Sequence, residues 1–124
     1  MELYDPNALM DDCIFCKIAR GEIPAKAVYR DDTAIAIEDV NPQAPTHLLV
    51  LPVKHYDTLG DTLAEADEES VAGRLFEIAT RLGKERGGAR GFRLVVNTGP
   101  DGGQTVGHLH IHVLAGRRMT WPPG

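Results

Sequence analysis

The sequence predicts an α+β fold, in which an antiparallel sheet of about five strands carries one long and one short helix. Two observations lead to this expectation. Several short aliphatic segments, joined mostly by short turns, have the alternation or the continuous apolar character of strands. One longer segment, residues 62–86, repeats apolar side chains at helical spacing. Because strand segments outnumber helical ones and only one connection is long, an antiparallel sheet fits better than alternating parallel units.

The chain begins with an acidic stretch, residues 1–12, that lacks a basic and apolar signal pattern. We expect a short, poorly ordered leader here, followed by a single domain over residues 13–124. The segment from Ile14 to Ala19 has apolar side chains at helical spacing and is followed by Gly21. This pattern predicts the short helix.

The strands are predicted over residues 27–30, 33–39, 45–52, 92–97 and 106–115. In the second of these, alternation places Asp39 on the same face as Ile35 and Ile37. The third is almost continuously apolar, which predicts burial on both faces, with His47 at its start. The long helix has acidic residues near its start and basic residues near its end, which suits the helix dipole.

The last predicted strand contains three histidines, His108, His110 and His112, in alternation with aliphatic residues. Alternation places all three imidazoles on one face. Imidazole titrates near neutral pH and can act as a nucleophile, a proton carrier or a metal ligand. A loop rich in glycine and polar residues, 97–105, leads into this strand. Its donors suit a phosphoryl group better than a bare metal ion, although an ordinary turn has the same composition.

Composition limits the class of protein. The chain has 124 residues, is 43% hydrophobic and carries a formal net charge of −5. The acidic balance argues against non-specific nucleic-acid binding, which needs a basic surface. No apolar run approaches the roughly 20 residues that span a membrane. A cytoplasmic protein without nucleic-acid or membrane partners is the expectation.

The two cysteines, Cys13 and Cys16, have two residues between them, and a disulfide framework is not expected from so few. Three interpretations stay open. They form a redox pair, they are two buried apolar side chains, or they are half of a zinc site. In the last case His47 and His108 are the candidates for the remaining ligands.

The segment from Asp101 to Leu114 resembles the signature of the histidine triad (HIT) superfamily, in which three histidines alternate with hydrophobic residues. The C-terminal Trp-Pro-Pro-Gly, residues 121–124, and the segment from Pro42 to His47 resemble its Hint branch, the purine nucleoside phosphoramidases. The resemblance covers residues 13–124. It implies the HIT-like fold, a homodimer, and cleavage of the P–N bond of purine nucleoside 5′-phosphoramidates to give a nucleoside monophosphate such as AMP.

The resemblance also implies residue roles. His110 would be the nucleophile that forms a nucleotidyl-histidine, His112 and His108 would orient it and handle protons, and His47 would support them. The implied nucleotide contacts are Phe15, Ile18, Ile37, Asp39, Asn97, Gly103, Gln104, Thr105 and Trp121. Some bacterial members with this cysteine pair carry a structural zinc, and catalysis would need no cofactor.

Three alternative functions stay open at this point. One is a dinucleoside polyphosphate hydrolase of the same superfamily. Another is a nucleotide-binding regulatory module with incidental turnover. The third is a hydrolase that uses the three histidines as metal ligands.

Overall fold

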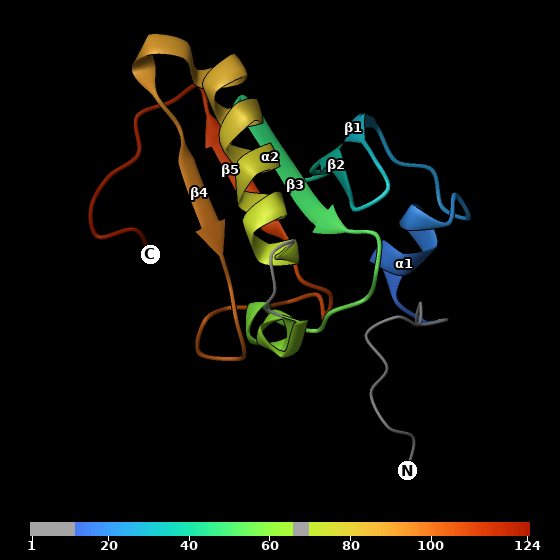
Figure 1. Ribbon diagram of the computed structural model, residues 1–124. Coiled ribbons are helices and arrows are strands. Elements are labelled where there is room, and N and C mark those ends of the chain that lie inside the picture. The colour runs from blue at the N-terminus through green and yellow to red at the C-terminus, as the bar shows by residue number, and fades with distance from the viewer. Residues whose placement is uncertain (1–11, 66–69) are drawn as a thin grey trace.

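The computed structural model describes residues 12–65 and 70–124, so nearly all of the expected leader (1–12) lies outside the described residues. The predicted fold class is confirmed: five strands form one antiparallel sheet in the order β1-β2-β3-β5-β4 (Figure 1). The strands are β1 (Ala27–Arg30), β2 (Ala34–Glu38), β3 (Thr46–Pro52), β4 (Arg93–Val96) and β5 (Ile111–Ala115).

The helices comprise the predicted short one, α1 (Ile14–Ala19), and a longer one, α2 (Val71–Gly87). The predicted start of the long helix at residue 62 is wrong. Helix α2 begins after Ser70, whose hydroxyl accepts a hydrogen bond from the Gly73 amide and so caps the first turn. The preceding residues form a separate 3₁₀ helix, η1 (Leu59–Glu65), and a second short one, η2 (Gly88–Arg90), follows α2.

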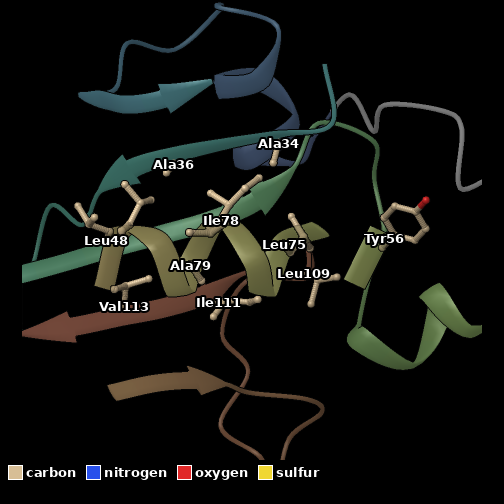
Figure 2. Close-up of a cluster of buried hydrophobic side chains, with 12 residues drawn as sticks. Ala34, Ala36, Leu48, Tyr56, Leu75, Ile78, Ala79, Leu109, Ile111 and Val113 are labelled. Carbon is tan, nitrogen blue, oxygen red and sulfur yellow. The ribbon is translucent and has the colours of Figure 1, made fainter. Parts of the chain in front are cut away.

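The main core lies between α2 and one face of the sheet. In Figure 2, side chains of α2 such as Leu75, Ile78 and Ala79 lie over the strands. Alternation along the strands supplies the partners, because every second residue points to this face. They include Ala34, Ala36, Leu48, Val50, Leu109, Ile111 and Val113.

The opposite face of the sheet carries a smaller buried cluster formed by Phe15, Ile35, Ile37, Leu49 and Leu51. Phe15 comes from α1, which lies apart from α2 near β1 and β2 (Figure 1). The two helices therefore cover opposite faces of the sheet. Helix α2 closes the main core, and α1 packs on the face that carries Ile35, Ile37, Leu49 and Leu51.

The observed ladder of β5 is shorter than the predicted strand at 106–115. Pairing with both β3 and β4 ends at Ile111, so His108 and His110 precede the ladder. The alternation nevertheless extends through them, because Leu109 is buried in the main core and its amide donates to the carbonyl of Tyr56 at 2.7 Å. The predicted separation of the histidines from the aliphatic face is thus confirmed.

Candidate functional site

The ring of His110 is held in one orientation by its own chain. Its Nδ1 lies 2.8 Å from the carbonyl oxygen of His108. Because a carbonyl only accepts, Nδ1 must carry the hydrogen, and in the neutral ring Nε2 keeps a free lone pair. Phe15 packs edge-on against the ring, with centroids 5.2 Å apart, and His110 is 7% exposed. A buried, oriented, unprotonated nitrogen is what a histidine nucleophile requires.

A second chain of hydrogen bonds sets the ring of His112. The main-chain amide of Gln43 donates to Nδ1 of His47 at 3.0 Å, so the neutral His47 ring carries its hydrogen on Nε2. That Nε2 lies 2.9 Å from Nδ1 of His112 and 3.4 Å from a carboxylate oxygen of Asp39. His112 therefore accepts at Nδ1 and carries a donor N–H on Nε2. The predicted association of His47 with these histidines is observed at His112, and we call His110 and His112 the histidine row.

Burial favours the neutral form of the His47 and His112 rings. Desolvation lowers the pKa of His112 to about 4, and the neighbouring His110 and His47 rings add to the effect. Burial also lowers the pKa of His47, although the Asp39 carboxylate opposes the shift. His112 is thus suited to hydrogen-bond donation from Nε2 near neutral pH.

The depressed pKa of His112 predicts a loss of stability in mild acid. His112 has a pKa near 6.5 in the unfolded chain and near 4 in the folded protein. Between these two pH values the unfolded state therefore binds more protons. Stability therefore falls as the pH drops through this window, by about 2 kcal/mol at pH 5, and the further loss from His112 is small below about pH 4. Urea unfolding of the wild type and His112→Gln at pH 7 and pH 5, with chelator present, measures it. An equal loss in both proteins would contradict the assignment.

A second group of side chains gathers beside His110. Nδ1 of His108 lies 3.3 Å from Sγ of Cys13 and 3.6 Å from Sγ of Cys16, and Nδ1 of His55 lies 3.3 Å from Sγ of Cys16. The four candidate ligand atoms, from Cys13, Cys16, His55 and His108, all lie within 4.8 Å of one another. We call these four residues the metal group.

The outer nitrogens of both histidines fit a metal centre. Nε2 of His108 lies 2.9 Å from the carbonyl oxygen of Pro52, and Nε2 of His55 lies 2.6 Å from a carboxylate oxygen of Asp57. Both acceptors place the ring hydrogen on Nε2, so each Nδ1 directs a lone pair at the sulfurs. Two thiols and two such imidazoles are the donor set of a tetrahedral structural zinc site, with the usual hydrogen-bond partners behind the histidines.

The expected set of four ligands needs a correction, because His55 stands where His47 was expected. The register that pairs Val50 with Ile111 brings the chain beyond Pro52 next to His108 and leaves His47 opposite Leu114. His55 lies in a polar connection without periodicity, so the sequence pattern did not single it out. His55 could have been found only by pairing the third strand with the last one, which brings the segment after Pro52 next to His108.

His108 has a different position from the one expected of a proton-handling residue. Its side chain is fully buried in the metal group, where desolvation lowers its pKa to about 4. It acts on His110 through its main-chain carbonyl instead. His108 is thereby the covalent link between the metal group and the histidine row.

The glycine-rich loop is held by two of the amides expected to bind phosphate. Gln104 donates from Nε2 to the carbonyls of Asp57, at 2.6 Å, and Val106, at 3.0 Å, and its Oε1 accepts from the amide of Gly99. Asn97 donates to the carbonyl of Gly102. These side chains shape the loop, while Gly103 and Thr105 are exposed on it.

The remaining expected nucleotide contacts divide into two sets. Ile37 is buried in the cluster that contains Phe15, Ile18 packs against that cluster, and Asp39 lies beside His47. The structure thus brings these three residues to the face of the sheet that carries the histidine row. Trp121 is 83% exposed on the C-terminal tail, which Arg93 of β4 holds by donating to the carbonyl of Thr120. This tail lies beside the edge strand opposite β1 (Figure 1).

No helix within the described residues is long and apolar enough to cross a membrane.

The model of the HIT domain family matches residues 20–119 of the chain. A 14 kDa zinc-binding protein of Zea mays is 44% identical, over 90% of this chain and 87% of its own length. The adenylylsulfatase HINT1 of Arabidopsis thaliana is 43% identical, over 90% of this chain and 76% of its own.

Two solved structures have the same fold. A HIT family hydrolase from Legionella pneumophila superimposes with a TM-score of 0.84 and 46% identity, covering 91% of this chain and all of that one. A zinc-bound histidine triad family protein from Mycobacterium smegmatis has a TM-score of 0.72 and 34% identity, covering 91% of this chain and 80% of that one. By the family model and by these relatives, the chain belongs to the HIT domain family.

Proposed function

We propose that the protein is a nucleotide-binding hydrolase that cleaves the P–N bond of purine nucleoside 5′-phosphoramidates through a nucleotidyl-histidine intermediate on His110. The observation that carries the proposal is the hydrogen bond from Nδ1 of His110 to the carbonyl of His108, because it leaves Nε2 as a free nucleophile. The buried Phe15 and Ile37 offer an apolar surface for the base, and Asp39 offers a carboxylate to the ribose hydroxyls.

In the first step Nε2 of His110 attacks the α-phosphorus, the N–P bond forms, and the bond to the leaving amine breaks. Nε2 of His112 is the N–H donor that the hydrogen bond from His47 defines. The negative phosphoryl group favours the charged form of a nearby imidazole, so the bound substrate promotes uptake of a proton from solvent at Nδ1 of His112, which releases the hydrogen bond accepted from His47. The imidazolium gives its proton to the leaving amine, and in the second step takes one from the water that releases the nucleoside monophosphate.

We further propose that the metal group holds a structural zinc. The donor set supports this, and so do the name of the maize relative and the zinc-bound Mycobacterium structure, which describe those proteins. When bound, the metal would supply folding energy by joining α1 to the segments that contain His55 and His108. In this scheme the histidine row performs the chemistry and no cofactor is required for catalysis.

A second substrate class has a specific observation in its favour. The Arabidopsis relative is named an adenylylsulfatase, which describes an adenylyl group with a sulfate leaving group. An adenylyl-His110 intermediate would be common to both substrates, and only the leaving group would differ. Dinucleoside polyphosphates would enter through the same intermediate with a nucleotide leaving group. A homodimer and a cytoplasmic location stay predictions.

The proposed function is tested by steady-state hydrolysis of adenosine 5′-phosphoramidate, adenosine 5′-phosphosulfate and diadenosine tetraphosphate under identical conditions. We expect the highest kcat/KM for the phosphoramidate and no dependence of turnover on added Mg²⁺. Preference for diadenosine tetraphosphate would replace the phosphoramidase assignment with the dinucleoside polyphosphate hydrolase. Binding of AMP without turnover of any of the three would leave a binding module.

A further inference from the structure

Asp57 touches both the metal group and the glycine-rich loop. Its carboxylate accepts from Nε2 of His55 at 2.6 Å, and its main-chain carbonyl accepts from Nε2 of Gln104 at 2.6 Å. One residue thus fixes a candidate metal ligand with its side chain and a loop amide with its backbone. The sequence pattern gave this residue no role.

We propose that Asp57 is a positioning residue that links the metal group to the glycine-rich loop beside His110. The inference rests on the proposed function, because it takes the metal group to hold zinc and the glycine-rich loop, as its donors suggest, to lie beside the phosphoryl group. Asp57 touches no reacting atom in this scheme. It acts through His55 on the metal and through Gln104 on the loop.

The geometry distinguishes Asp57 from an ordinary surface carboxylate. Its side chain is 57% exposed, yet it lies in hydrogen-bond contact with an imidazole whose side chain is only 3% exposed. A carboxylate behind a ligand histidine fixes the ring and raises its basicity, and replacement of such partners typically costs 10–100-fold in metal affinity. The exposed position also means that replacement of Asp57 leaves no cavity in the core.

The second half of the link is the loop itself. The side chain of Gln104 bonds to the main chain of Gly99 and Val106, which holds the loop together. It also bonds to the main chain of Asp57, which attaches the loop to that segment. Next to this contact, the amide of Leu109 donates to the carbonyl of Tyr56. A shift of the segment that contains Tyr56 and Asp57 would therefore move the chain on both sides of His108, at Gln104 and at Leu109.

The experiment compares the wild type with Asp57→Ala, Asp57→Asn and a control, Asp32→Ala, on the exposed turn between β1 and β2. Zinc affinity is measured by competition of Zn²⁺ with a chromogenic chelator. We expect Asp57→Ala to bind Zn²⁺ about 10–100-fold more weakly. Asp57→Asn, which keeps an oxygen acceptor, should recover most of the affinity, and the control should match the wild type.

Hydrogen exchange of the main-chain amides in residues 99–109 gives a readout independent of activity. With Zn²⁺ saturating, we expect faster exchange in Asp57→Ala than in the wild type, and a higher KM for the phosphoramidate with a smaller change in kcat. Wild-type zinc affinity in Asp57→Ala, or unchanged exchange at saturating Zn²⁺, would overturn the proposal. If the wild type hydrolyses none of the adenosine substrates, the proposed function fails, and zinc affinity and exchange still decide the role of Asp57.

Discussion

Replacement of His110 by alanine should lower kcat/KM for adenosine 5′-phosphoramidate by at least about 10⁴-fold, because loss of a covalent nucleophile removes the two-step path. The residual rate would come from substrate binding and from donors around the phosphoryl group. Intact-protein mass spectrometry after rapid mixing with substrate gives a direct check. The wild type should gain the mass of one adenylyl group transiently, and His110→Ala should not.

His112→Gln is the matched control for this experiment. It removes the proton donor and leaves the nucleophile and its bond to the His108 carbonyl in place. We expect slow turnover with an adduct still detectable. Because alanine removes a buried ring that packs against Phe15, thermal melting of His110→Ala is measured alongside to check that the variant remains folded. An adduct of wild-type yield on His110→Ala would contradict the assignment of the nucleophile.

The strand pattern allowed the main features of this site to be predicted from the sequence. Period-two alternation at 108–113 separates the histidines from the aliphatic residues whatever the exact start of the ladder. The same logic placed Asp39 with Ile35 and Ile37, and the structure brings Asp39 beside His47. These predictions depend on local geometry, which a single sequence carries.

The features that could not be predicted depend on contacts between distant segments. The choice of His55 over His47 in the metal group follows from the register of β3 on β5. The start of α2 depends on the cap by Ser70, while Glu65, expected in the helix, instead binds Lys54 at 2.9 Å. In both cases the residue type was compatible with either position, and only the tertiary structure decided between them.

Removal of zinc should lower the melting temperature of the wild type by about 10–20 °C. A metal that binds only the folded state stabilises it by about 4 kcal/mol when its free concentration is 1,000 times its dissociation constant. For a domain of this size, 1 kcal/mol corresponds to a shift of about 4 °C. The effect is large because Cys13 and Cys16 flank Phe15 on α1, while His55 and His108 belong to distant segments. Calorimetry with saturating Zn²⁺ and with excess chelator measures the difference.

Cys16→Ala makes this prediction specific. Cys16 is fully buried and its sulfur contacts both histidines of the metal group, so alanine removes one ligand with little change in shape. The variant should melt near the chelated wild type and gain only a small shift from Zn²⁺. Mg²⁺, which prefers oxygen ligands, should shift neither protein. If Cys16→Ala gains the full shift from Zn²⁺, the metal binds elsewhere. In that case the four side chains of the metal group stabilise α1 through their own hydrogen bonds and packing alone.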